Sequence, residues 1–417
     1  RTFTATHTYA TAIDVFAVGA TVIDNHGDGT GDGVPVAVAD ILGPVVFFND
    51  IIGLDTSVRD FWYTLESTNQ GWFTMEAIFR GPGDANLTFY DIDLNQVATS
   101  SLMWGNQRID RLVSPGEKFY VQLSGTSTDV ALRAVNLVDH SDSTVTVLGT
   151  DNNDTYELVT GTPHQLTVNG VRYDFDPATV DSITIDGGDG RDTLVVAGSD
   201  GTDAFTFNAN GERVTTISNA EYQFTATAVE TVAFDGTTGS DSVVLIGTPG
   251  DETGNFWPDH GTFEDGHFSD VEKGISGDFA VSVSNVSSIK AFAAEEVNAG
   301  NPADAAVTKG IDAVYMYDSP GDDRFESQPF HANMSGPTFA HETFGFMFNY
   351  GYATTRDGGF DVAVMEDSDD DDKFKLDWPK EGQFFGKMYR SSYYNRAKMF
   401  EDITAQFSDG PGVDTVR

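Results

Sequence analysis

The sequence contains no cysteine, and this absence excludes a disulfide framework, a thiolate metal site and a cysteine nucleophile. Basic residues are scarce as well: 23 Lys and Arg stand against 65 Asp and Glu, which gives a formal net charge of −42. A charge of this sign repels nucleic acid and anionic lipid and attracts hydrated cations. We therefore expect no nucleic-acid partner.

Membrane-spanning and signal-type segments are also missing. No run of about 18 apolar residues occurs, and no basic-then-apolar segment opens the chain at Arg1. We expect no membrane insertion, and we expect the sequence to be part of a longer or processed protein. Hydrophobic residues nevertheless make up 39% of the 417 residues and aromatic residues 12%, so two or three folded domains with buried cores are expected.

Helical periodicity is scarce in this chain. Short runs rich in Val, Ile, Thr, Phe and Tyr alternate apolar with polar residues, and Gly, Asp, Asn or Pro interrupts them every ten or so residues. This pattern is typical of an all-β protein.

An internal repeat organises residues 140–417. The frame D-x-V-x-hydrophobic-x-[GD]-[ST]-x-x-x-[DE]-x-[FY] starts near residues 143, 192, 241, 312, 361 and 414, and three of the intervals are 49 residues long. The interval after 241 is longer, with an insertion at about 255–310. A unit of this length holds four or five strands. We predict a β-solenoid, or β-helix, of about five units, with tandem small sandwiches as the alternative.

The frame predicts which side chains face the core. Its third and fifth positions are apolar, for example Leu194 and Val196, so that strand should turn one face inward. An aromatic residue opens the second strand in four copies, and we expect these rings to form a stacked ladder. They are Tyr156, Phe205, Phe325 and Phe374.

Residues 1–139 lie outside the repeat and contain strand-like runs with a turn at Pro115-Gly116. We predict an antiparallel, jelly-roll-like β-sandwich. The runs RDFWYTL, ANLTFYDIDLNQVA and SPGEKFYVQL, with YATAIDVFAVGAT near the start, resemble the pre-peptidase C-terminal (PPC) domain. That family is a secreted β-sandwich found beside extracellular hydrolases and in bacterial surface proteins, so the resemblance implies an extracellular protein.

The repeat region has a resemblance of its own. YDSPGDDRF (Tyr317–Phe325) and GGDGRDTLV (Gly187–Val195) resemble acidic repeat tracts of very large exported bacterial surface proteins. The second string also has the form of one RTX-like (haemolysin-type) calcium nonapeptide. These resemblances imply a scaffold role at the cell surface and supply no catalytic residue.

Calcium is the cofactor that the acidic turns suggest, because carboxylates and turn carbonyls are the oxygen ligands that Ca²⁺ prefers. A continuous calcium roll needs ligands every nine residues, whereas here they recur every 49, so we expect at most single sites in turns. Solvated Asp/Gly turns explain most of the same residues. The candidate ligands are Asp189, Asp192, Asp200, Asp203, Asp322, Asp323, Asp369 and Asp372.

Two other loops contain residue patterns that are similar to those of metal sites. Asp24 and Asp28 imitate the start of an EF-hand loop, but Pro35 stands where its last ligand should be. The segment Trp257–Asp270 gathers His and carboxylate side chains that could ligate a transition metal, although acidic surface loops collect such groups by composition alone.

Exposed tyrosines could bind sugars. YRSSYYN (Tyr389–Asn395) and NYGYA (Asn349–Ala353) place tyrosines at alternate or adjacent positions, and a core or interface ladder is the interpretation that we favour for them. A β-helical enzyme that cleaves acidic polysaccharide could use Asp369–Asp372 with Lys373 and Lys375. Acids at this place in every copy instead indicate a structural role, and no known catalytic motif appears.

We therefore predict a non-enzymatic, extracellular or cell-surface structural protein, part of a larger assembly such as a filament, surface layer or adhesin stalk. Its expected partners are further copies, other surface proteins or polysaccharide. A calcium- or polysaccharide-binding module of a secreted enzyme is the first alternative, and a polysaccharide-cleaving β-helix is the second.

Overall fold

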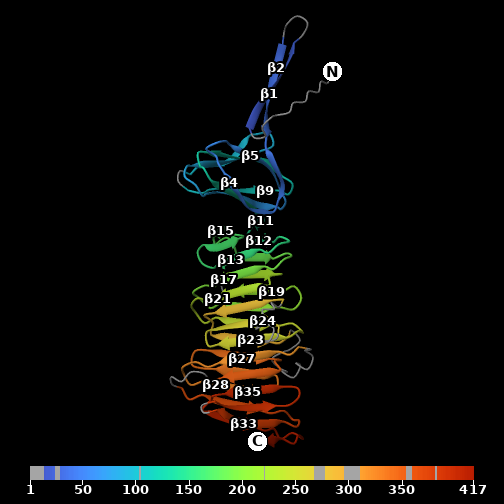
Figure 1. The fold of residues 1–417 in the computed structure, drawn as a ribbon, viewed down its shortest axis with the longest axis vertical. Helices are drawn as coiled ribbons and strands as arrows, with labels where there is room; N and C mark the ends of the chain where they lie inside the picture. Colours follow the sequence, from blue (N-terminus) through green and yellow to red (C-terminus); the bar gives the residue numbers. More distant parts are fainter. Residues whose placement is uncertain are drawn as a thin grey trace. The chain divides into compact units, whose positions relative to one another are not determined.

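The computed structural model describes residues 14–23, 29–102, 105–219, 221–266, 278–294, 310–353, 359–380 and 383–417. Every regular element in these ranges is a β-strand, so the all-β prediction is confirmed. No helix that could cross a membrane is found in them. The chain divides into two compact units, Arg1–Ser141 with Val145–Leu148, and Asp142–Thr144 with Gly149–Arg417. Figure 1 shows the strands of both units in sequence colours.

The first unit contains a hairpin and two sheets. Strands β1 and β2 pair with each other, one sheet has the order β3-β5-β10-β7-β8, and in the other β11 lies between β4 and β6, which in turn pairs with β9. The strands are β1 (Asp14–Ile23), β2 (Gly29–Val38), β3 (Asp40–Val45), β4 (Phe47–Leu54), β5 (Phe61–Ser67), β6 (Gly71–Phe79), β7 (Ala85–Tyr90), β8 (Gln96–Ser100), β9 (Gln107–Val113), β10 (Lys118–Gly125) and β11 (Val130–Ser141).

Both sheets contribute to one core in this unit. Fully buried apolar side chains come from β5, β7 and β10 on one side and from β6 and β11 on the other. Phe119 lies among these side chains, and the centroid of its ring is 4.7 Å from that of Phe73 and 5.2 Å from that of Phe89. The sequence places apolar residues at alternate positions in these strands, which is why each sheet buries one face.

Each complete copy of the frame forms five strands, all in the second unit except β12 (Thr144–Leu148), most of which belongs to the first. They are β12 to β16 in the first copy, and then β17–β21, β22–β26, β27–β31 and β32–β36, with β37 (Thr415–Val416) opening a sixth. Their bounds are β13 Thr155–Val159, β14 His164–Val168, β15 Val171–Phe175, β16 Ser182–Asp186, β17 Thr193–Ala197, β18 Ala204–Asn208, β19 Val214–Ser218, β20 Gln223–Thr227, β21 Thr231–Asp235, β22 Ser242–Ile246, β23 Glu252–Trp257, β24 His260–Asp265, β25 Ala280–Ser284, β26 Ser288–Phe292, β27 Ala313–Tyr317, β28 Arg324–Gln328, β29 His331–Ser335, β30 Ala340–Phe344, β31 Phe348–Tyr352, β32 Val362–Glu366, β33 Lys373–Lys380, β34 Gln383–Tyr389, β35 Tyr394–Lys398 and β36 Asp402–Gln406.

Successive copies use the two sheets of this unit in opposite ways. In the copy at 192, β17 and β21 lie in one sheet and the antiparallel triple β18–β20 in the other. In the copy at 241 the triple β23–β25 lies in the first of these sheets, while β22 and β26 lie in the second. Parallel pairs such as β18–β22 and β17–β21 join the strands within each sheet. Equivalent residues of neighbouring copies therefore belong to different sheets.

Burial follows the predicted alternation. Leu194, Val196, Val243 and Leu245 are buried, which confirms the inward face of the first strand. The four aromatic residues at the second strand are buried too, but the ladder predicted for them is wrong, because consecutive copies place them in opposite sheets. Phe205 stacks instead on Phe234 of its own copy, with 4.8 Å between the ring centroids.

The segment expected in the insertion begins with a regular hairpin. Strands β23 and β24 pair through Trp257 and His260, and β23 continues the sheet by pairing with β27. The hairpin is the counterpart of β18–β19 in the copy at 192. Residues 267–277 and 295–309 of this copy lie outside the described residues.

Candidate functional site

Each copy of the frame carries one buried acid in the turn after its first strand, and we call these five the turn acids. Each carboxylate accepts hydrogen bonds from the N–H and the hydroxyl of the Ser or Thr four residues earlier. Ser199 donates its N–H to Asp203 Oδ2 at 2.7 Å and its hydroxyl to the same atom at 3.1 Å. The turn thereby satisfies its own buried donors. The turn acids are Asp154, Asp203, Glu252, Asp323 and Asp372.

A second set of acids, the strand-start acids, links one copy to the next. The Oδ1 atom of each accepts the backbone N–H of a turn acid in the preceding copy, at 2.7–3.0 Å. Hydrogen bonds to carboxylates are stronger than neutral ones, so these contacts hold adjacent copies in register. The strand-start acids are Asp192, Asp241, Asp312, Asp361 and Asp414.

Burial makes these carboxyl groups hard to ionise. It raises the pKa of Asp192 and Asp361 from 3.8 to about 6. It also raises the pKa of Asp312 to about 6 and that of its neighbour Glu252 to about 9. Glu252 Oε2 and Asp312 Oδ2 are buried without another partner, and one proton shared between the two carboxyls would satisfy both oxygens.

The structure separates the eight predicted calcium ligands into two groups. Asp192, Asp203, Asp323 and Asp372 are buried members of the two acid sets. Asp189, Asp200, Asp322 and Asp369 are exposed at the turns. Two of the exposed acids accept hydrogen bonds from the last residues of their own copy: Asp322 from the N–H of Phe360 at 2.9 Å, and Asp200 from the hydroxyl of Thr238 at 3.1 Å. Asp24 and Asp28 lie outside the described residues.

The glycines of GGDGRDTLV serve close packing within and between copies. Gly188 and Gly190 have φ angles of 83° and 118°. A Cβ at Gly188 would lie 2.5 Å from the carbonyl oxygen of Thr150 in the same copy, and a Cβ at Gly187 would lie 2.3 Å from that of Ala228 in the next copy. Asp189 lines a hollow of about 260 Å³ whose lining also includes Glu230, Asp278, Arg191 and Arg213. Arg213 pairs with Glu230 at 3.0 Å, so the lining carries charges of both signs.

The other predicted groupings also find structural roles. The His260 ring stacks on Trp257 and its Nδ1 lies 2.7 Å from Asp259 Oδ1, while His267 and Asp270 lie outside the described residues. Lys375 pairs with Asp377 at 2.6 Å, and Asp372 is occupied by Ser368 and the Tyr393 hydroxyl. A catalytic arrangement of Asp369–Asp372 with these lysines therefore gains no support from the geometry.

A separate surface carries the tyrosines whose exposure the sequence left undecided. Partly exposed aromatic side chains alternate with buried residues along β23, β27, β31, β34 and β35, which belong to one sheet. On β31, for example, Tyr350 and Tyr352 flank the buried Gly351. We call this surface the aromatic face. It consists of Trp257, Tyr315, Tyr317, Phe348, Tyr350, Tyr352, Phe385, Lys387, Tyr389, Tyr394, Arg396 and Lys398.

Strand register aligns these side chains in three rows across the sheet. Cross-strand neighbours in a sheet lie about 5 Å apart, so side chains in a row touch. The rows are Tyr317, Tyr352, Lys398 and Phe385; Tyr315, Tyr350, Arg396 and Lys387; and Phe348, Tyr394 and Tyr389. Residues far apart in sequence are therefore brought into one continuous surface.

The rings in these rows stack face to face. The ring centroids of Tyr315 and Tyr350 are 4.7 Å apart with an interplanar angle of 11°, and those of Trp257 and Tyr317 are 4.8 Å apart at 5°. Burial of this kind raises the pKa of Tyr315 and Tyr350 above the ordinary value of 10.0. Because neighbouring rings cover each other's faces, the surface presents ring edges and phenolic hydroxyls.

Cations without carboxylate partners complete the aromatic face. The Arg396 guanidinium lies 4.7 Å from the centre of the Tyr350 ring, and the Lys398 ammonium lies 5.6 Å from that of Tyr352. Within the described ranges, neither cation forms an ion pair, and Arg396 Nε is buried without a hydrogen-bond partner. Two uncompensated positive charges in a chain of net charge −42 are a specific feature of this surface.

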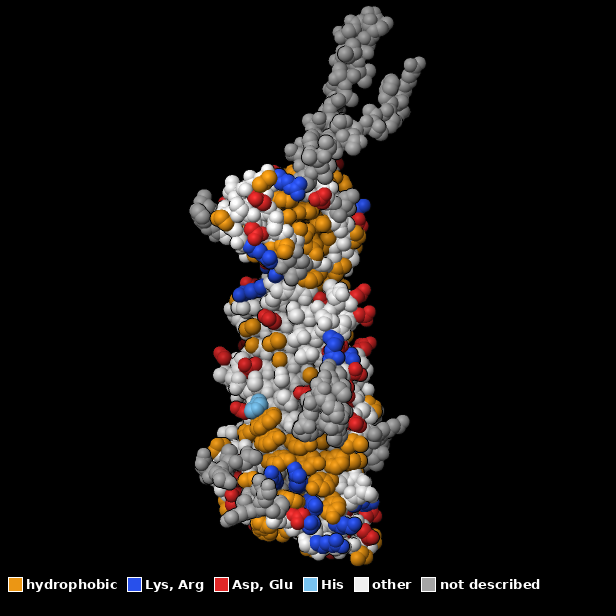
Figure 2. All heavy atoms as spheres, in the orientation of Figure 1, with side chains coloured by type: hydrophobic (Ala, Val, Ile, Leu, Met, Phe, Trp, Pro, Cys, Tyr) orange, Lys and Arg blue, Asp and Glu red, His pale blue; other side chains and the backbone are white. Residues whose placement is uncertain are grey.

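Earlier copies show that the fold does not require these aromatics. The equivalent outward positions of β17 and β21 in the same sheet are Thr193, Val195, Ala197, Thr231, Ala233 and Asp235. Figure 2 shows the difference: hydrophobic side chains gather with Lys and Arg over β27 and β35, whereas the region of β17 and β21 is mainly uncoloured. The aromatic residues are therefore available for contact with a partner.

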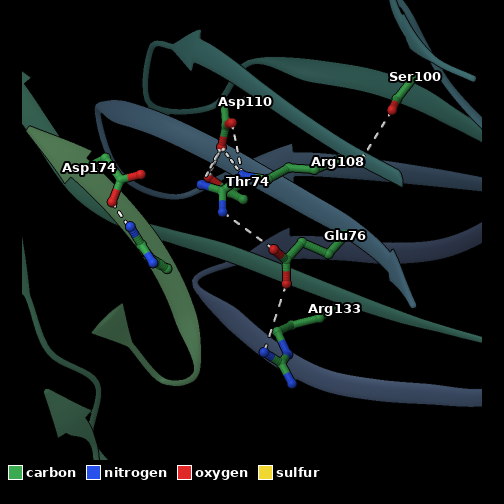
Figure 3. Close-up of polar contacts among 8 residues, drawn as sticks. Thr74, Glu76, Ser100, Arg108, Asp110, Arg133 and Asp174 are labelled. Carbon is green, nitrogen blue, oxygen red and sulfur yellow. Dashed lines mark hydrogen bonds and ion pairs between the residues drawn. The ribbon is translucent and has the colours of Figure 1, made fainter. Parts of the chain in front are cut away.

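On β6, β9 and β11 of the first unit, in contrast, charged side chains pair with neighbours of opposite charge. Arg108 pairs with Asp110 at 2.9 Å and with Glu76 at 3.3 Å, and Glu76 also meets Arg133 at 3.8 Å. Thr74 donates its hydroxyl to Asp110 at 2.7 Å (Figure 3). This network on β6, β9 and β11 resembles a structural ion network rather than a site that awaits a ligand.

No family model matches this chain, and no curated protein matches it. Among solved structures, it is similar to the pre-peptidase C-terminal domain of collagenase from Bacillus anthracis, at 14% identity over 23% of this chain and 92% of that one, with a TM-score of 0.19.

Two further solved structures are similar to parts of the chain. One is PliG of Aeromonas hydrophila, a periplasmic inhibitor of g-type lysozyme, at 16% identity over 23% of this chain and 97% of that one, with a TM-score of 0.18. The other is the M60 catalytic domain with two CBM51 domains of Clostridium perfringens ZmpB, at 9% identity over 57% of this chain and 27% of that one, with a TM-score of 0.17. TM-scores of this size do not support an inference about function.

Proposed function

We propose that this chain is a non-enzymatic structural protein of an extracellular or cell-surface assembly. In this proposal the first unit is a PPC-like β-sandwich, and the second is a β-solenoid that serves as a stalk or filament segment. The aromatic face makes the contact between one chain and the next. The single observation that carries the proposal is the aromatic face, with its unpaired Arg396 and Lys398.

The regular use of acids supports a structural rather than a catalytic role. The same carboxylates recur in every copy and accept hydrogen bonds from backbone groups of their own or the preceding copy. An active site is built once, from residues that differ from their counterparts in other copies. The acids that dominate the composition therefore build the stack of copies.

The composition of the aromatic face supports contact with another protein. Tyr, Trp and Arg are the residues that most often dominate binding energy at protein interfaces. The face is cationic, whereas 65 acidic residues make the chain as a whole strongly negative. The surface of a second, negatively charged chain therefore complements the charge of this face. A contact between two different surfaces of identical chains leads to open filaments or layers when it does not close on itself.

The dimensions of the face indicate weak individual contacts. The five strands β23, β27, β31, β35 and β34 span about 20 Å at the usual strand spacing, and three rows add about 13 Å, which gives about 260 Å² between the outermost Cα atoms. Standard interfaces bury about 800 Å² per partner. We therefore expect assembly to depend on protein concentration and on many contacts acting together.

Replacing two central tyrosines should weaken assembly. Tyr315→Thr with Tyr350→Thr installs the kind of side chain that β17 and β21 carry outward, so the strands should persist while the stacked pair is lost. We expect concentration-dependent self-association of the unaltered chain in sedimentation velocity, and association at least tenfold weaker for the double variant, which corresponds to about 1.4 kcal/mol.

Val195→Thr, on the exposed outer surface of β17, is the matched control and should associate like the unaltered chain. Circular dichroism should show the same β content in all three proteins. Self-association of the double variant that equals that of the unaltered chain would contradict the role given to the aromatic face.

An acidic polysaccharide is the second candidate partner for this face. The row of phenolic hydroxyls and the two unpaired cations are the observations that favour it, because both can bind carboxylate or sulfate groups of a glycan. A chain that stays monomeric at every concentration, yet is retarded in a gel containing acidic glycan unless Tyr315 and Tyr350 are replaced, would favour this candidate over assembly.

A further inference from the structure

Three carboxylates meet near the C-terminal end of the second unit, at the turn of the copy at 361. One ligand oxygen from each of Asp367, Asp372 and Asp414 lies within 4.8 Å of the others. Asp372 is a turn acid and Asp414 a strand-start acid, so each other copy has an equivalent pair. Of the residues that the structure describes, only these three form such a group.

Asp367 adds a carboxylate that three of the other four complete copies lack, while the copy at 312 has Asp318 at this position. The equivalent position is glycine in the copies at 143, 192 and 241, namely Gly149, Gly198 and Gly247. At Gly198, a Cβ would lie 2.6 Å from Oδ2 of the turn acid Asp203, so this position faces the carboxylate of the turn acid. The copy at 361 therefore adds a third carboxylate where those copies have no side chain.

The Asp367 side chain is buried and only half satisfied. It is 9% exposed, and its Oδ1 accepts the N–H of Ser408 at 2.6 Å. Its Oδ2 is buried and has no hydrogen-bond partner. A buried carboxylate oxygen without a partner costs free energy, and a bound cation would satisfy this oxygen.

No Lys or Arg side chain of the described residues bonds to the cluster. The guanidinium of Arg390 lies close enough to act on Asp372 through its charge, but it bonds to Ser368 and Asp370. Within the described ranges, neither Asp367, Asp372 nor Asp414 forms an ion pair with Lys or Arg. Three carboxylates held this closely repel one another unless a proton or a metal ion joins them.

The donor set suits a calcium ion. Ca²⁺ takes six to eight oxygen ligands at about 2.3–2.6 Å in flexible geometry, whereas the smaller Mg²⁺ demands near-ideal octahedral geometry and gives up its waters reluctantly. Three carboxylates within 4.8 Å of one another therefore suit the larger and more adaptable ion.

From these observations we infer that Asp367, Asp372 and Asp414 bind one calcium ion, which stabilises the last turn of the stack. The ion bridges Asp367 and Asp372 of one copy to Asp414, the first residue of the next. Binding thus links adjacent copies at a place where the others rely on a hydrogen bond alone.

Calorimetric titration of the full chain with CaCl₂, after removal of metal by a chelator, tests this inference. We expect one saturable site in the unaltered chain and a higher melting temperature with calcium, since a ligand that binds only the folded state stabilises it. Asp367→Asn keeps an oxygen for the Ser408 N–H but removes the charge, and it should weaken calcium binding at that site at least tenfold.

Asp409→Asn is the matched control, because Asp409 is an exposed acid in the neighbouring turn, and it should bind calcium like the unaltered chain. Asp367→Gly, the residue that three other copies carry, should fold and should also lose the site. No saturable calcium binding in the unaltered chain would overturn the inference, as would equal binding in the unaltered chain and both Asp367 variants. MgCl₂ should compete only at much higher concentration, and equal competition would exclude the size argument.

Discussion

Asp203→Ala should lower the free energy of unfolding by about 3–5 kcal/mol, because three side chains lose the carboxylate that accepts their hydrogen bonds. The Asp203 carboxylate accepts hydrogen bonds from Ser199, from Asn219 Nδ2 at 3.0 Å and from the Tyr222 hydroxyl at 2.9 Å. Alanine leaves the buried Tyr222 hydroxyl and the partly buried donors of Ser199 and Asn219 without this acceptor, and each unsatisfied buried group costs about 1–3 kcal/mol.

Urea denaturation followed by circular dichroism measures this loss. Asp200→Ala changes an exposed acid of the same turn and should stay within about 0.5 kcal/mol of the unaltered chain, as surface substitutions usually do. Asp203→Asn should fall between the two, because its amide oxygen still accepts one donor. A loss below about 1 kcal/mol for Asp203→Ala would refute the role of turn acids in holding the copies together.

The second large effect should appear in the pH dependence of stability. Burial raises the pKa of Asp192, Asp312 and Asp361 from 3.8 to about 6, so the folded chain retains protons that the unfolded chain releases between these two values. Their stabilising contribution is therefore complete below about pH 4 and is lost as the pH rises through about 6. We expect the free energy of unfolding in urea to fall over this interval.

Salt and substitution separate this effect from general repulsion between acids. In 1 M NaCl the Debye length is about 3 Å, so repulsion between exposed carboxylates is screened while the buried groups still titrate. The double variant Asp192→Asn with Asp361→Asn keeps the Oδ1 acceptors but cannot titrate, and its stability should fall less steeply. Stability that is constant or rises from pH 4 to pH 7 in high salt would contradict the raised pKa values.

The repeat frame also predicts the hydrogen bonds within each turn. Its Ser or Thr, followed four residues later by Asp or Glu, is the sequence signal of a side chain that satisfies turn donors. The calcium hypothesis for Asp203 and Asp323 overlooked that signal, because oxygen-rich turns suit a metal and a backbone equally well. The change from glycine to aspartate at one frame position was also visible in the sequence, at Asp318 and Asp367. Only the structure shows that Asp367 belongs to the three-carboxylate group where calcium binding is inferred.

The aromatic face shows what the sequence left open. Tyr393 and Tyr394 are neighbours in the chain, yet Tyr393 is buried against Asp372 while Tyr394 lies outward beside Phe348. Abundant aromatics on both faces obscure the alternation that would assign them. The favoured interpretation was a core or interface ladder, and the core fits Tyr393 alone, because Tyr350, Tyr352, Tyr389 and Tyr394 are partly exposed.

The sequence by itself determined the all-β class, the repeat frame with its 49-residue spacing, and the inward face of strands such as β17, because turn residues and two-residue alternation are local properties of the chain. Only the tertiary structure decided that consecutive copies exchange sheets, and hence that Tyr350 lies between Tyr315 and Arg396 in one row. The physical reason is that pairing between strands separated by dozens of residues depends on how all copies pack together, and no short stretch of sequence specifies that register.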